Sequence, residues 1–236
     1  MEEKVNAIVL SAVSYGENDK ILTLFTLEKG VKSAKIKGVK KSGAKLKFAS
    51  EPFCFSEYIL SVKGEYSSVI NASMHDSFYP LREDVIKYYG ASSVLEFIKK
   101  NCPDGVESKE LFFLTIKTLE NIAYGDNPIL EVVNFFLLAL KQIGYGVIFD
   151  GCGDCGNEIN GRVFFDFSQG TAYCQACAPE TATEISIHTY NLLKDLSDGK
   201  AAVNLAYLKR AYKLLLHYLT QKTVEHKVAE TFLTLI

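Results

Sequence analysis

Four of the six cysteines in this chain form two CxxC pairs, Cys152 with Cys155 and Cys174 with Cys177. Eighteen residues separate the pairs, which is the spacing of a zinc ribbon, where each tight CxxC turn presents two thiolates to one ion. Four thiolates complete a tetrahedral shell and leave no position for a substrate. We therefore expect one structural Zn²⁺ per chain.

Redox chemistry is the alternative for these cysteines, either as a thioredoxin-like pair or as two reversible disulfides. One redox motif does not explain a second pair at this distance, so the spacing favours the metal. The other two cysteines, Cys54 and Cys102, stand in apolar segments. We expect them in the core or at a helix end, since cysteine is a common buried residue.

A run of lysines is the second candidate site. Residues 29–47 contain eight lysines and no acidic residue, although the whole chain has a net charge of −2. Such a local positive patch can bind a polyanion through its phosphates. The alternative is a solvated loop without a ligand. The candidate nucleic-acid-binding lysines in this run are Lys32, Lys35, Lys37, Lys40, Lys41, Lys45 and Lys47.

Aromatic side chains near the lysines could stack on bases. Tyr15, Phe25 and Phe48 are the candidates, and we favour Phe48 because Phe25 stands within an apolar strand-like segment.

A third cluster is a basic stripe of Lys209, Arg210 and Lys213. These residues share the polar face of a predicted helix that is marked by Leu205, Leu208, Tyr212, Leu215 and Leu219. The stripe suits an acidic partner, and a solvated helix face is the alternative. The sequence contains no GxSxG, HExxH or paired-carboxylate arrangement, so we expect a protein without catalytic activity.

Composition limits the class of protein. The chain has 236 residues, of which 48% are hydrophobic and 23% charged, which is typical of a globular protein. Its longest largely apolar stretch, residues 129–140, is too short to span a bilayer. The sequence opens with two acidic residues and lacks a basic leader pattern. We expect a cytoplasmic protein with no membrane partner.

The elements that position these residues change character along the chain. Five short β-branched and aromatic segments, separated by turn signals, predict a five-stranded barrel. These segments are residues 5–13, 20–27, 31–38, 53–62 and 65–72. After Pro80 the apolar residues recur at helical spacing, most clearly in residues 129–140, where Asn127 is a candidate cap and Pro128 fills the first turn. Two more helices are predicted after the cysteine-rich segment.

The predicted fold class is therefore α+β, with three parts. Residues 1–79 form a β-barrel, residues 80–147 and 180–236 form a helical domain, and residues 148–179 form an inserted four-cysteine zinc ribbon.

Several barrel segments resemble a known family. Ala7-Ile-Val-Leu10, Tyr15-Gly-Glu-Asn-Asp19, Lys20-Ile-Leu-Thr-Leu-Phe-Thr26, Lys29-Gly30, Lys37-Gly38 and Glu51-Pro-Phe53 are similar to the amino-terminal signature of the bacterial DNA repair protein RecO family. The cysteine insertion and the length agree with the same family. The resemblance implies that the barrel is of the oligonucleotide/oligosaccharide-binding (OB) type.

The resemblance also implies a function. RecO proteins are recombination mediators that bind single- and double-stranded DNA, anneal complementary strands and help RecA to replace single-strand-binding protein, with RecR as partner. It implies nucleoid association during repair, and it places Lys20, Lys35, Lys37, Lys40 and Lys41 on the basic barrel surface. The acidic tail of single-strand-binding protein would suit the stripe at Lys209, Arg210 and Lys213. A zinc-stabilised protein–protein adaptor that does not bind DNA is the alternative, followed by a thiol-disulfide oxidoreductase.

Overall fold

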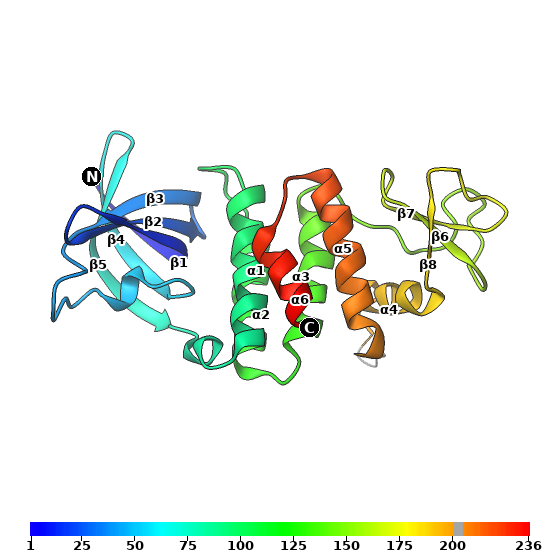
Figure 1. The fold of residues 1–236 in the computed structure, drawn as a ribbon. Coiled ribbons are helices and arrows are strands. Elements are labelled where there is room, and N and C mark those ends of the chain that lie inside the picture. Colours follow the sequence, from blue (N-terminus) through cyan, green and yellow to red (C-terminus); the bar gives the residue numbers. More distant parts are fainter. Residues whose placement is uncertain (201–204) are drawn as a thin grey trace. The chain divides into compact units, whose positions relative to one another are not determined.

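The chain forms two compact units, Met1–Gly125 and Asp126–Ile236, in a computed structural model that describes residues 1–200 and 205–236 (Figure 1). The first unit contains two helices in addition to the barrel, because the contacts of these helices lie mainly within this unit. The domain limits predicted from the sequence, at residues 79/80, 147/148 and 179/180, remain a prediction.

A closed barrel of five strands, in the order β1-β2-β3-β5-β4, begins the first unit. Strand β1 pairs antiparallel with both β2 and β4, and a β-bulge between Val9 and Ser11 bends it from one partner towards the other. The barrel closes where β3 runs parallel to β5, at Lys35 and Ser68. The predicted OB-type barrel is thus confirmed. Its strands are β1 (Glu2–Tyr15), β2 (Asp19–Thr26), β3 (Gly30–Ile36), β4 (Phe55–Lys63) and β5 (Tyr66–Asp76).

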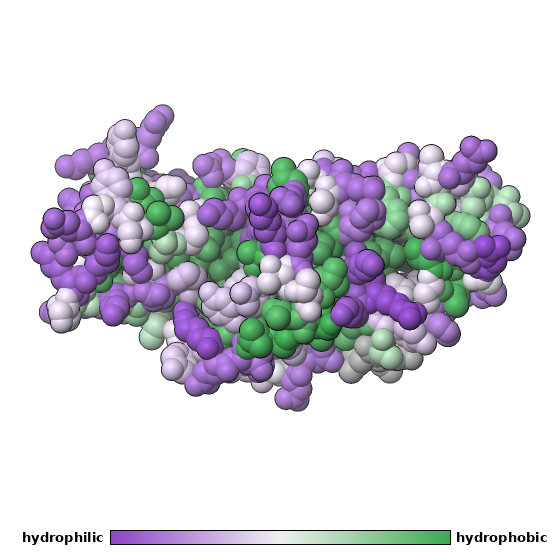
Figure 2. Space-filling model, in the orientation of Figure 1, coloured by the Kyte–Doolittle hydropathy of each residue, from purple (hydrophilic) through white to green (hydrophobic). Residues whose placement is uncertain are grey.

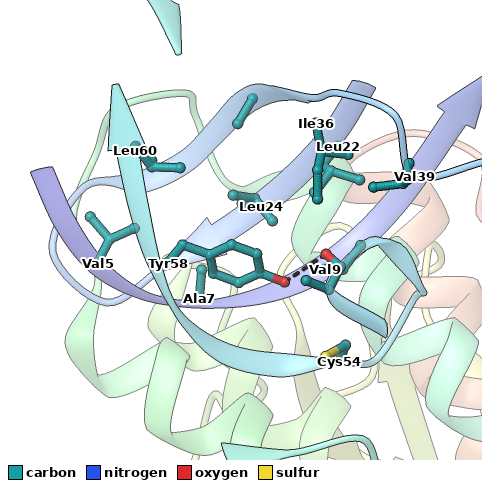
Figure 3. Close-up of a cluster of buried hydrophobic side chains, with 12 residues drawn as sticks. Val5, Ala7, Val9, Leu22, Leu24, Ile36, Val39, Cys54, Tyr58 and Leu60 are labelled. Carbon is teal, nitrogen blue, oxygen red and sulfur yellow. Dashed lines mark hydrogen bonds between the residues drawn. The ribbon is translucent and has the colours of Figure 1, made fainter. Parts of the chain in front are cut away.

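Alternation along the strands fills the barrel interior. In β4 the side chains of Ser56, Tyr58 and Leu60 are buried and their neighbours are partly exposed, as the period of two in a strand requires. The Tyr58 hydroxyl donates a 2.9 Å hydrogen bond to the Ala49 carbonyl (Figure 3). Burial raises the pKa of Tyr58, so this hydroxyl stays a neutral donor. Cys54 belongs to the same core, as its apolar context predicted.

Helices α1 (Val85–Asn101) and α2 (Lys109–Tyr124) complete the first unit. The loop between them lies against β3, because the Gly105 amide donates to the Val31 carbonyl at 3.0 Å. Gly30 makes this approach possible: its φ is +61°, and a Cβ atom there would meet the Val106 carbonyl oxygen at 2.1 Å. Only glycine combines this backbone angle with so close a neighbour.

The second unit surrounds helix α3 (Pro128–Gln142). The predicted cap is confirmed, because the Asn127 side chain accepts a 3.0 Å hydrogen bond from the Leu130 amide. Helix α5 packs on α3, with the rings of Phe136 and Tyr212 5.5 Å apart. The other elements are β6 (Val163–Asp166), β7 (Thr171–Cys174), β8 (Thr183–Ile185), α4 (Ile187–Ser197), α5 (Leu208–Lys222) and α6 (Lys227–Leu235).

The helix count after the cysteine-rich segment is a correction to the sequence prediction. In the part of the chain that the structure describes, three α-helices follow this segment, α4, α5 and α6, where two were expected. Helix α6 is nine residues long and buries only Ala229 and Phe232, which is too little for a helical period to stand out. Strand β8 was also missed, since three residues carry no measurable alternation. Among the described residues, no helix has the length and apolar character needed to cross a membrane.

Candidate nucleic-acid interface and metal centre

The four predicted ligand cysteines come together in the second unit. Their sulfur atoms all lie within 4.8 Å of one another. The β6–β7 hairpin makes this possible, because it carries Cys174 at the end of β7 and lies beside the first CxxC turn. The Gly153 amide donates to the Ala172 carbonyl at 2.9 Å and so fixes that turn against β7.

Local backbone hydrogen bonds shape both cysteine turns. The Gly156 amide donates to the Cys152 carbonyl, and the Cys177 amide donates to the Cys174 carbonyl. The Cys174 amide also points at the Cys152 sulfur, 3.4 Å away. Burial opposes the Cys152 thiolate, but the amides of Cys155, Cys174 and Asp154 outweigh it and lower its pKa to about 6. The loop therefore favours an anionic sulfur at this position.

The donor set fits a structural zinc ion. Four thiolates at about 2.3 Å from a tetrahedral zinc are about 3.8 Å apart, a separation that this cluster allows. A bound ion would neutralise the crowded sulfurs and fasten the two turns to each other. With all four positions taken by protein, the ion would offer no open site for chemistry. Cys102 lies apart from this cluster, at the C-cap of α1, as its sequence context predicted.

The eight candidate lysines of the first unit fall into two groups. Three of them lie on barrel strands and form ion pairs with carboxylates. These pairs are Lys20 with Glu51 at 3.0 Å, Lys32 with Glu3 at 3.1 Å and Lys35 with Asp19 at 2.9 Å. Their charges are therefore already balanced within the barrel.

The second group lies in the connection between β3 and β4 and is exposed. None of its five members is within 4.0 Å of a carboxylate in the described parts of the chain. We call Lys37, Lys40, Lys41, Lys45 and Lys47 the loop lysines. Hydrophilic side chains predominate on the surface over the barrel, at the left of Figure 2. Uncompensated positive charge is thus concentrated in this one loop.

The β1–β2 turn holds the start of this loop in place. One oxygen of Asp19 accepts from the Gly38 amide at 2.8 Å, and the other pairs with Lys35. Lys35 and the Gly38 amide hold the pKa of Asp19 below its usual range. The Lys40 amide donates to the Asn18 carbonyl at 3.1 Å. The start of the loop that carries the loop lysines is therefore held in a fixed position against the β1–β2 turn.

The aromatic candidates differ in how far the structure exposes them. Phe25 is fully buried, and Phe48 is half-buried against the barrel core. Tyr15 is 52% exposed, and the Lys35 ammonium lies 4.5 Å from its ring centre. A role of Phe48 in stacking remains a prediction, whereas Tyr15 presents an accessible ring.

A cleft of about 480 Å³ lies beside Tyr15 on the barrel surface. Glu65 of the β4–β5 turn and Tyr66, the first residue of β5, also line it. Sequence reasoning missed both residues, because nothing local to that turn shows that it comes close to β1. The residues around the cleft come from β1, β2, β3, the β4–β5 turn and β5, and they include Tyr15, Ile21, Ser33, Lys35, Glu65 and Tyr66.

The predicted partner stripe lies on the exposed face of α5. Arg210 and Lys213 line a second cavity, of about 360 Å³, together with His217 and Leu214. Strand β8 lines the same cavity. Lys209 is not among the lining residues, and its ammonium donates to the carbonyl of the last residue, Ile236. Two of the three predicted residues thus share a cavity that also has apolar lining.

These features define a class of protein: a closed OB-type barrel with a basic loop, joined to a helical unit with four cysteines that can hold a metal ion. Comparison with known proteins identifies the family. The "Recombination protein O N terminal" model matches residues 1–78 and the "Recombination protein O C terminal" model matches residues 82–229. The chain belongs to the RecO family.

Curated relatives agree over most of the chain. A DNA repair protein RecO of Pelotomaculum thermopropionicum is 32% identical over 225 residues, covering 92% of this chain and 88% of its own length. The RecO protein of Clostridium perfringens is 32% identical and covers 89% of this chain and 82% of its own length. The RecO protein of Clostridium novyi is 33% identical, and the match covers 82% of this chain and 76% of that protein's length.

Proposed function

We propose that this protein is a non-catalytic recombination mediator of DNA repair, which binds single- and double-stranded DNA through the basic loop of its barrel. The observation that carries the proposal is the group of five exposed loop lysines without a carboxylate partner. Lysines in such an arrangement bind phosphates by releasing condensed counterions, whatever the base sequence. Membership of the RecO family supports the repair role.

Strand annealing follows from the same electrostatics. Lysines that neutralise phosphates on two strands lower their mutual repulsion and allow complementary bases to pair. In this proposal the protein also helps RecA to load onto DNA coated with single-strand-binding protein, acts with RecR, and works in the cytoplasm at the nucleoid. The four-cysteine centre binds Zn²⁺ and supports the fold of the second unit.

The salt dependence of DNA binding tests this proposal. If four to six phosphates are neutralised, the logarithm of the association constant for a single strand should fall with the logarithm of salt concentration with a slope of about −3 to −4. Fluorescence anisotropy of a labelled oligonucleotide over a salt series gives this slope. Binding that is absent at low salt would instead favour the protein–protein adaptor, and a slope near zero would contradict the electrostatic mechanism.

We also propose that the α5 cavity receives the acidic tail of single-strand-binding protein. Arg210 and Lys213 supply positive charge beside apolar Leu214, which suits a peptide that carries both carboxylates and apolar side chains.

Reversing the two lining charges should weaken this interaction. We expect the double variant Arg210→Glu/Lys213→Glu to bind a synthetic peptide of that tail at least about tenfold less tightly, because like charges would then face each other. Lys209→Glu is the matched control on the same helix, outside the cavity lining, and should lose less. Isothermal titration calorimetry measures both. Equal losses in the control and the double variant would show that general charge, rather than the cavity, attracts the peptide.

A further inference from the structure

The α5 cavity is lined by two parts of the second unit. One part is the basic face of α5, with Arg210 and Lys213, and the other is Phe167 of the β6–β7 turn together with the three residues of β8. The rings of Phe167 and His217 join the two parts, with their centroids 4.6 Å apart. The cavity therefore depends on the β6–β8 sheet being held against α5.

Thr189 of α4 also lines this cavity. The residue is only 3% exposed, and its hydroxyl has no hydrogen-bond partner among the described residues. A buried hydroxyl without a partner costs free energy, and a polar group of a ligand in the cavity would remove that cost. This hydroxyl supports a binding role for the cavity independently of the two cations on α5.

The part of the lining that comes from the sheet is directly connected to the cysteine cluster. Strand β8 pairs with β6, and β6 pairs with β7, which ends at Cys174. Only five residues separate Cys177 from the first residue of β8. The second CxxC turn therefore fixes one end of the segment that leads into the cavity.

Asp166, the last residue of β6, ties that segment to the turn that carries Phe167. One carboxylate oxygen accepts from the Thr181 hydroxyl at 2.9 Å, and the other accepts from the Ser168 amide at 2.7 Å. Burial opposes the charge of Asp166, but these hydrogen bonds outweigh it and lower the pKa of the carboxyl group. Asp166 is therefore a charged acceptor that holds Thr181 beside the β6–β7 turn.

We propose that Asp166 is a positioning residue through which the four-cysteine centre controls the α5 cavity. When the cysteines hold a metal ion, the second CxxC turn keeps Thr181 on Asp166, and β8 and Phe167 keep their places beside α5. Without the ion that turn loosens, and the sheet side of the cavity is lost. The inference rests on the proposed metal centre, and it uses the proposed acidic-tail peptide as a probe.

Coupling between two binding sites is reciprocal, which gives two matched measurements. We expect metal-free protein, prepared with a chelator under anaerobic and reducing conditions, to bind the synthetic tail peptide at least about tenfold less tightly than zinc-loaded protein in isothermal titration calorimetry. Saturating peptide should raise the affinity for zinc by the same factor, measured by competition with a chromogenic chelator. Hydrogen exchange of residues 183–189 should be slow with zinc and fast without it.

Asp166→Asn and Thr181→Val test the connection itself. The first removes the charge and keeps the side-chain size, and the second removes one hydrogen bond at an exposed residue, so it should fold even if the first does not. Both should keep one equivalent of zinc, because the four cysteines are intact, but the ratio of peptide affinities with and without zinc should fall towards one. A residue that only stabilised the fold would leave this ratio unchanged. Thr181→Ser, which keeps the hydroxyl, is the matched control and should keep the full ratio.

Equal peptide affinities with and without zinc would overturn the proposal, and so would a Thr181→Val variant that keeps the full ratio. If zinc-loaded protein does not bind the peptide, the proposed role of the cavity fails separately. Hydrogen exchange of residues 183–189 then decides the coupling, which is overturned if their exchange does not respond to zinc. Protein that binds no zinc would overturn both the metal centre and this inference. None of these outcomes bears on DNA binding by the barrel, which the salt series tests by itself.

Discussion

Changing all five loop lysines to glutamine is expected to weaken single-stranded DNA binding about three-thousandfold near 0.1 M salt. Each phosphate neutralised on a single strand releases about 0.7 counterion, so one lysine contributes about fivefold at this salt concentration and five contribute about three-thousandfold. Anisotropy titrations should also show the salt slope collapsing towards zero. Since these side chains are exposed and form no ion pair with the described residues, the stability of the barrel should change little.

An equal change of net charge elsewhere provides the control. Five surface lysines that each pair with an acidic residue are changed to glutamine, and DNA affinity should fall less than about tenfold. These are Lys4, Lys109, Lys117, Lys194 and Lys227. A control that loses as much affinity as the loop variant would mean that the overall charge of the protein, and not the β3–β4 loop, binds DNA.

If the four cysteines hold zinc as proposed, its loss is expected to unfold the two cysteine turns and leave the barrel folded. Structural zinc binds with an apparent free energy of about 10 to 16 kcal/mol, which rivals the stability of a whole domain. The hairpin core beside the turns is small, with Val163, Phe165 and Ala172 buried. In Cys155→Ser/Cys177→Ser we expect zinc to fall from one equivalent to almost none. Hydrogen exchange should then become fast in residues 150–157 and 174–181 and stay slow in the barrel strands.

Cys102→Ser is the matched control, because it removes a thiol outside the cluster, and it should keep one equivalent of zinc. Metal retention should fall as the pH is lowered, since the four thiols must lose their protons to bind. Anaerobically purified protein without zinc, but with a reversible disulfide between these cysteines, would contradict the zinc centre and favour the oxidoreductase. If the metal-free variant lost DNA binding while its barrel stayed protected, the ribbon would have to contact DNA as well.

Short-range features were predictable from the sequence. The spacing of the two CxxC pairs predicted that their four cysteines come together, because each pair is only three residues apart and a hairpin of ordinary length joins the pairs. The strands of the barrel follow from alternation and turn residues, and the cap of α3 follows from Asn127 and Pro128. Each of these depends on neighbours within a few residues, which sequence patterns describe well.

Long-range contacts determined which of the candidate side chains are paired or buried. The sequence alone placed all eight candidate lysines in one group, and only the fold showed which of them are neutralised. Glu51, Glu3 and Asp19, which pair with Lys20, Lys32 and Lys35, are far from them along the chain. An ion pair across strands leaves no trace in local composition.

The aromatic residues show the same division. Phe48 was a reasonable stacking candidate from its position after the lysines, but the barrel core half-covers its ring. Tyr66 carries no such signal, and it reaches the cleft with Tyr15 only because β5 closes the barrel against β3. The sequence by itself thus determined the barrel, the four cysteines that come together and the positive charge of the segment after β3. Which lysines and rings are exposed and unpaired was decided by tertiary structure, because burial and charge pairing depend on residues that folding alone brings together.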